Sequence, residues 1–145
     1  MPDAATLEML FKLTLATVLG MAIGLEREHR AKPAGLRTYT LVTLGAALFT
    51  LMSQQNFLER AFDPSRIASQ VVVGIGFLGA GLIFLKGDEV QGLTTAAGLW
   101  VAAAIGMTVG FGFYTVAIYA TVLALLILWV FRRIEGKIPK SPYIK

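Results

Sequence analysis

The chain has 145 residues, of which 56% are apolar and only 15% are charged. With its long uncharged runs, this composition indicates one compact membrane domain and excludes an ordinary soluble protein. The absence of cysteine excludes disulfides and zinc–thiolate sites, and the single histidine, His29, excludes histidine-cluster metal sites. We therefore expect a non-enzymatic protein without a cofactor, in which the net charge of +4 reflects membrane topology rather than binding to nucleic acid.

Apolar runs along the chain predict an all-α, polytopic bundle of five transmembrane helices. The predicted spans are residues 7–25, 39–54, 66–86, 94–110 and 114–131, and residues 132–145 form a basic cytoplasmic tail. In the first span Glu8 precedes Lys12 by one turn, which favours a local ion pair over a role for Lys12 in an ion pathway. The fifth span is poor in glycine and rich in large aliphatic residues, so we expect it to face lipid.

The third span is rich in glycine, and we expect it to be the central helix of the bundle. Its glycines fall on both faces of a helix that turns by about 100° per residue. Small residues let membrane helices approach closely, which is how they pack without a hydrophobic driving force. The fourth span also carries glycines, at a spacing of four residues. The predicted helix-packing motif comprises Gly74, Gly76, Gly79, Gly81, Gly98 and Gly106.

Local signals define the ends of the third and fourth spans. Asp63 followed by proline is typical of a helix start, with the aspartate as N-cap. The run Gly87 to Glu89 predicts a tight polar turn after the third span. Either Thr94 or Thr95 can then cap the fourth span.

The distribution of lysine and arginine predicts the orientation of the bundle. With the N-terminus outside, ten of the 13 basic residues fall inside, whereas Arg60 and Arg66 lie outside and Lys12 lies in the first span. We therefore predict an N-out, C-in topology. A shift of 57 positions aligns residues 24–38 with 81–95, which suggests two parallel helical hairpins related as an internal repeat.

Polar residues at the predicted membrane faces are the candidates for function. This set comprises Glu26, Arg27, Arg37, Thr38, Asp63, Arg66, Gln70, Thr94 and Thr95. A simpler interpretation is that they are topology residues and helix caps. Two carboxylates, Glu59 and Asp63, are weak candidates for a magnesium site, and no other metal ligands are predicted. The glycine run GIGFLGAG lacks the residues of a nucleotide-binding loop, and no nucleophile stands beside a base.

Three stretches together resemble the membrane domain of the MgtC/SapB family of bacterial inner-membrane proteins. They are GLEREHRAKPAGLRTYTLVTLGAALF, DPSRIASQVVVGIGFLGAGLIF and GLTTAAGLWVAAAIGM. Because no second folded domain is expected after the fifth span, the resemblance is to the short, SapB-like members. It implies a multi-pass inner-membrane protein linked to growth in low magnesium and to acid tolerance.

Two hypotheses follow from the resemblance and the polar residues. In the first, the chain modulates another membrane complex, such as the ATP synthase, during magnesium limitation or acid stress. Its partners would then be the bilayer, another membrane protein and, in a homodimer, a second copy. The alternative is a transporter or channel for magnesium or another cation, with Glu59, Asp63 and Gln70 at its entrance. The lack of acidic residues deep within the spans favours the first, whereas the apparent repeat favours the second.

Overall fold

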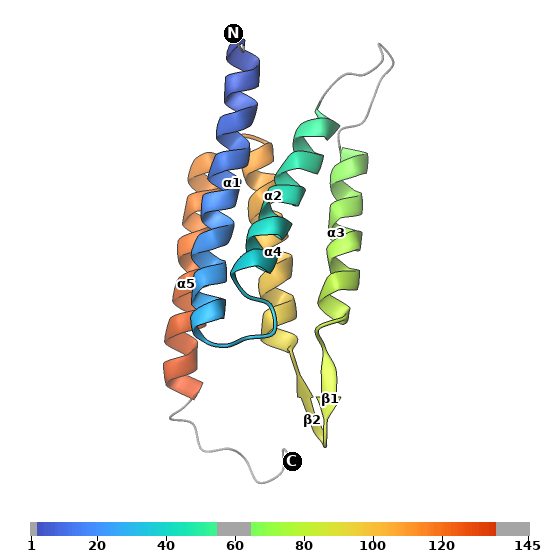
Figure 1. The fold of residues 1–145 in the computed structure, drawn as a ribbon, viewed down its shortest axis with the longest axis vertical. Helices are drawn as coiled ribbons and strands as arrows, with labels where there is room; N and C mark the ends of the chain where they lie inside the picture. The colour runs from blue at the N-terminus through green and yellow to red at the C-terminus, as the bar shows by residue number, and fades with distance from the viewer. Residues whose placement is uncertain (1–2, 55–64, 136–145) are drawn as a thin grey trace.

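The computed structural model of the protein describes residues 3–54 and 65–135, which form an upright helical bundle with a β-hairpin at one end (Figure 1). The elements are α1 (Ala4–His29), α2 (Leu36–Ser53), α3 (Ser65–Ala80), β1 (Phe84–Lys86), β2 (Glu89–Gln91), α4 (Leu93–Gly110) and α5 (Tyr114–Glu135). Of these, α1, α2, α4 and α5 are long and apolar enough to cross a membrane, and α3 contains a shorter apolar helix, Ala68–Ala80. The chain is therefore an all-α membrane protein apart from the short hairpin.

The central helix of the bundle is α4. It packs against α1, α2, α3 and α5, whereas α3 lies at the edge and packs against α2 and α4 (Figure 1). The expectation that the third span is central is therefore wrong. Half of α4 is buried by the other helices, and only 11% of α5 is, so α5 lies on the outside of the bundle as predicted.

The third helix ends earlier than its apolar run. The predicted span reaches residue 86, but α3 ends at Ala80, and the following apolar residues form the antiparallel hairpin of β1 and β2. Lys86 pairs with Glu89 across the turn, and Gly87 has a φ of +64°. Glycine at the first central position of a two-residue loop suits the twist of a hairpin. The predicted polar turn is confirmed, but it joins two strands instead of two helices.

Backbones of α1, α2 and α4 approach one another at glycines. A Cβ atom added at Gly20 would lie 2.5 Å from Oγ1 of Thr43, and one added at Gly24 would lie 2.8 Å from Cα of Leu36. On the other side of α2, a Cβ at Gly106 would overlap the carbonyl oxygen of Thr43. The second helix, α2, thus makes close glycine contacts with α1 on one side and with α4 on the other, and we call these two sets of contacts the glycine seams. Membrane helices that pack through small residues are expected to approach in this way.

The glycines of α3 have different surroundings. A Cβ at Gly74 or Gly76 would meet no atom of the described chain within 4 Å. At Gly79 the nearest atom would be Cβ of Ala96, at 3.6 Å, an ordinary packing distance. Gly81 follows the end of the helix. The edge position of α3 explains why its glycines are not enclosed on both faces.

The fourth helix is not capped by a threonine. Its N-cap is Gly92, which has a φ of +92° and makes no side-chain capping hydrogen bond, so the predicted cap at Thr94 or Thr95 is wrong. Between the hairpin and α4 the chain passes through a left-handed conformation at Gly92, which glycine tolerates. Gly35 is the N-cap of α2; it has an extended backbone conformation and likewise offers no capping side chain of its own. The internal repeat and the N-out, C-in orientation stay predictions.

Replacing Gly106 by alanine tests the packing of α2 on α4. We expect Gly106→Ala to lower the stability by about 1–3 kcal/mol, because the added methyl group must displace the backbone of Thr43. Thermal unfolding in detergent, followed by tryptophan fluorescence, measures the effect. Gly76→Ala is the matched control and should unfold at or slightly above the parent temperature, since its methyl group meets no neighbour. Equal melting temperatures for the two variants would contradict the packing described.

Candidate functional site

Most of the predicted polar residues lie at the end of the bundle where α1 and α5 finish and α2 and α4 begin (Figure 1). Arg27 is only 3% exposed there, and its Nε donates to Oε2 of Glu26 at 2.6 Å. Nε of Arg30 lies 3.5 Å from the other oxygen of Glu26. A buried charge is tolerated when it is paired, so Glu26 compensates both arginines within α1.

The loop between α1 and α2 is attached to α1 by a residue that was not among the candidates. Oε2 of Glu28 accepts a hydrogen bond of 3.0 Å from the backbone N–H of Leu36, in the first turn of α2. A Cβ at Gly35 would overlap the same carboxylate. Arg37 and Thr38 follow on α2 and are exposed. The carboxylate of Glu28 thereby takes the role of the N-cap side chain that Gly35 lacks.

Tyr39 is the second residue that the sequence analysis missed. Its side chain is completely buried, and its hydroxyl donates to the carbonyl oxygen of Thr95 at 3.1 Å. Gly98, one turn further along α4, leaves room for the ring, since a Cβ there would overlap the tyrosine hydroxyl. Burial without a hydrogen bond would be costly for a phenol. The contact therefore sets the register of α2 against α4.

The remaining candidates are at the opposite end. Arg66 and Gln70 lie on exposed positions of α3, whose start is far from the starts of α2 and α4 (Figure 1). Glu59 and Asp63 lie outside the described residues. The predicted cluster is therefore divided between the two ends of the bundle. Within residues 3–54 and 65–135, no group of three or more His, Cys, Asp or Glu side chains could hold a metal ion.

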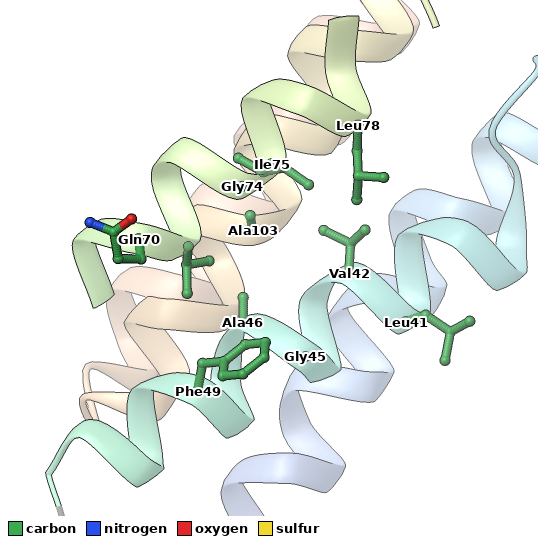
Figure 2. A pocket seen from close by; sticks show the side chains of 11 residues that line it. Leu41, Val42, Gly45, Ala46, Phe49, Gln70, Gly74, Ile75, Leu78 and Ala103 are labelled. Atoms are coloured by element: carbon green, nitrogen blue, oxygen red, sulfur yellow. The ribbon is translucent and has the colours of Figure 1, made fainter. Parts of the chain in front are cut away.

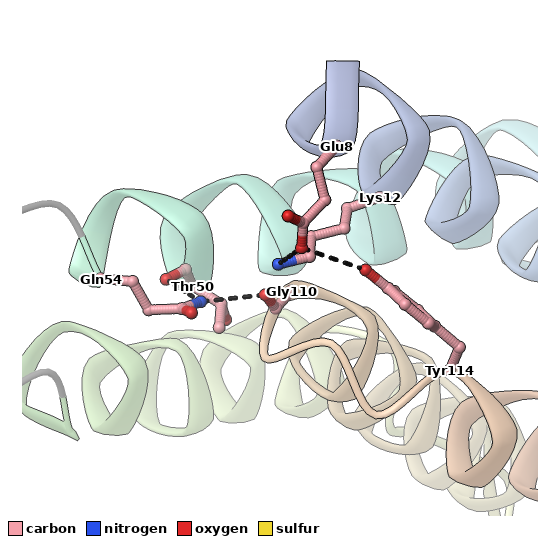
Figure 3. A network of polar contacts seen from close by, with 6 residues as sticks. All are labelled: Glu8, Lys12, Thr50, Gln54, Gly110 and Tyr114. Carbon is pink, nitrogen blue, oxygen red and sulfur yellow. Dashed lines mark hydrogen bonds and ion pairs between the residues drawn. The ribbon is translucent and has the colours of Figure 1, made fainter. Parts of the chain in front are cut away.

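Two separate sets of polar contacts join helices at this opposite end of the bundle (Figure 3). Nζ of Lys12 lies 2.9 Å from Oε1 of Glu8, which confirms the predicted local pair, and the Lys12 side chain is 10% exposed. The hydroxyl of Tyr114 donates to the same carboxylate oxygen at 3.4 Å. Nearby, Nε2 of Gln54 donates to the carbonyl oxygen of Gly110 at 2.9 Å. The first set joins α1 to the start of α5, and the second joins the end of α2 to the end of α4.

An apolar groove lies between α2 and α3. It encloses about 550 Å³, and Ala103 of α4 forms part of its floor. Gly45 of α2 and Gly74 of α3 leave it open, because a Cβ at either position would meet no atom of residues 3–54 and 65–135 within 4 Å. Phe49 and Gln70 lie at one end of the groove (Figure 2). Among the described residues of its lining, Gln70 has the one polar side chain, and the others are hydrocarbon or glycine. We call this feature the α2–α3 groove.

Removal of the Tyr39 hydroxyl tests the register contact. We expect Tyr39→Phe to cost about 0.5–2 kcal/mol, the range for a buried hydrogen bond between membrane helices. Chemical unfolding in mixed micelles measures the change. Tyr119→Phe, on an exposed position of α5, serves as control and should leave the stability unchanged. An equal effect of both substitutions would show that the Thr95 contact does not join the two helices.

Comparison with known proteins identifies the family. The sequence profile of the MgtC family matches residues 13–137. YhiD of Escherichia coli strain K12, which its name describes as a candidate magnesium transporter, is 45% identical over 144 residues, or 95% of this chain and 67% of its own. SapB of Bacillus subtilis is 40% identical over 139 residues, which are 88% of this chain and 60% of that protein.

A third relative is MgtC of Brucella abortus, which is 48% identical over 112 residues, covering 77% of this chain. The match spans only 46% of that protein. No solved structure matches the chain. The profile match and these relatives show that the chain belongs to the MgtC/SapB family.

Proposed function

We propose that this protein is a non-enzymatic inner-membrane protein that modulates another membrane complex, such as the ATP synthase, in magnesium limitation or acid stress. The physiological setting comes from the family resemblance. The α2–α3 groove carries the part of the proposal that concerns binding. One transmembrane helix of the partner complex binds in this groove.

The lining of the groove supports a helix as occupant. Gln70, Gly74 and Leu78 follow one another at a spacing of four residues along α3, so they form one continuous helical face. Gly45 lies on the facing side of the groove, on α2. Glycines on both walls allow a third backbone to approach closely, which is the main source of affinity between membrane helices. Gln70 adds one amide that can hydrogen-bond across the interface.

The alternative is a transporter for magnesium or another cation, as the name of YhiD describes for that relative. Magnesium prefers carboxylates and water as ligands. Among the described residues, however, the buried charged side chains are Lys12 and Arg27, both basic. Each is paired with a carboxylate of its own helix. This charge pattern is unfavourable for a cation pathway, so we favour the modulator.

Crosslinking from inside the groove tests the proposal. A photo-reactive amino acid in place of Gly45, irradiated in native membranes, should give one defined adduct with a different membrane protein, identified by mass spectrometry. Gly74→Leu in the same background should abolish the adduct, because the larger side chain fills the opposite wall. Gly76→Leu should leave it intact, since Gly76 is equally open but does not line the groove.

Two other outcomes would overturn the proposal. An adduct only with a second copy of the chain would make the groove a homodimer interface. Adducts only with lipid, unaffected by Gly74→Leu, would show that no protein occupies it. Growth in low magnesium of a strain that depends on this protein gives a parallel readout. We expect it to fall with Gly74→Leu and to persist with Gly76→Leu, at equal protein abundance.

A further inference from the structure

A second cavity, separate from the α2–α3 groove, lies at the end of the bundle where α4 begins. It encloses about 620 Å³ and is lined by α1, the loop after it, the β-hairpin, the first turn of α4 and the last turns of α5. Elements from both ends of the sequence thus build one cavity. We call it the basic cavity, because every charged residue that the described part of the chain contributes to its lining is basic: Arg27, Lys32 and Arg132.

The three cations are contributed by different elements. Arg27 comes from α1 and is 3% exposed, and Glu26 compensates part of its charge. Lys32 comes from the loop after α1, and Arg132 from the last turn of α5; both are exposed. Glu26 does not line the cavity. The lining therefore carries a net positive charge that favours an anion.

The start of α4 adds to this preference. Residues 92–95 line the cavity, and the N-cap, Gly92, supplies no side-chain acceptor for the first turn. Unpaired N–H groups and the positive end of the helix dipole favour a phosphate at such a position. Thr94 and Thr95, two residues that carry hydroxyl groups, also line the cavity.

Part of the cavity wall is apolar. Phe84 of β1 and Leu128 and Phe131 of α5 form part of it. A free phosphate ion would leave this wall in contact with water, whereas an amphipathic anion would cover it. Basic pockets between transmembrane helices on the cytoplasmic side bind anionic lipid head groups. The predicted topology places this end of the bundle on the cytoplasmic side.

We infer that the basic cavity binds the head group of an anionic phospholipid of the inner leaflet. The phosphate is held by Lys32, Arg132 and the first turn of α4, and the upper acyl carbons lie against the apolar wall. Because the loop after α1, the hairpin and α5 all line the cavity, a bound lipid joins these elements to the start of α4. The site is independent of the groove and of the modulator proposal.

Titration of the detergent-purified protein with short-chain phosphatidylglycerol, followed by native mass spectrometry, tests the site. The parent protein should bind phosphatidylglycerol more tightly than phosphatidylcholine of the same chain length. Lys32→Gln and Arg132→Gln should each weaken phosphatidylglycerol binding about fivefold, the contribution expected of one cation near a lipid phosphate. Both residues are exposed, so neither substitution should prevent folding.

Arg133→Gln is the matched control. Arg133 neighbours Arg132 and carries the same charge, but it stacks on Trp129, at 4.4 Å from the ring centre, and does not line the cavity. It should leave the affinity unchanged. Equal loss with all three variants, or equal binding of the two lipids, would overturn the inference. Inorganic phosphate that displaces phosphatidylglycerol at equal concentration would assign the cavity to a free anion and overturn the lipid.

Discussion

Close contact between the backbone of α2 and its neighbours is the constraint on which the rest of the fold depends. A membrane bundle gains little from burying apolar side chains, because lipid is as apolar as the protein interior. Cohesion must come from close packing and from hydrogen bonds between helices. Here α2 packs closely against Gly20 and Gly24 of α1 on one side and against Gly98 and Gly106 of α4 on the other. Tyr39 then fixes the register through the carbonyl of Thr95.

This arrangement leaves α3 outside the group of helices that are joined by close glycine contacts. The glycine seams join α1, α2 and α4, whereas α3 contacts the bundle at its edge and contains a shorter apolar helix. A Cβ atom at Gly74 or Gly76 of α3 would meet no described atom within 4 Å, whereas one at the glycines of α1 or α4 would overlap a neighbouring helix. A helix that is rich in small residues but not enclosed by its own chain is suited to receive another helix.

The two proposed binding features lie in different environments. The α2–α3 groove is almost wholly apolar, so it suits an occupant within the hydrocarbon region. The basic cavity combines cations, a helix start and an apolar wall at the end of the bundle. Such a combination suits a group at the boundary between lipid and water. A membrane protein that modulates a partner can use both, with lipid at one site and a helix at the other.

Sequence patterns predicted where the helices lie along the chain better than which helices pack against one another. Apolar runs located α1, α2, α4 and α5, since length and hydropathy are local properties. The third helix was extended past Ala80 because hydropathy alone does not distinguish an apolar strand from a helix. The spacing of the glycines identified helix faces that carry small residues, but it did not show which of these faces another helix would cover. Gly106 is enclosed by α2, whereas Gly74 is open.

The polar residues likewise show that local sequence patterns do not predict contacts between distant parts of the chain. The pair of Glu8 and Lys12 was predictable because the two are one turn apart, but Tyr39 and Thr95 are separated by 56 positions. Long-range contacts of this kind depend on the crossing of the helices, which no local pattern encodes. A tyrosine near a helix start is ordinary at a membrane interface. Its burial against a glycine of a distant helix becomes visible only in the fold.

Magnesium flux into liposomes containing the purified protein tests most directly the claim that this chain binds a partner instead of transporting an ion. A magnesium-sensitive dye inside the vesicles reports entry, and empty liposomes provide the background. We expect no flux above background from protein whose melting temperature shows that it is folded. A saturable flux, reduced by Gln70→Leu at the entrance suggested for a cation, would contradict it and establish a transporter.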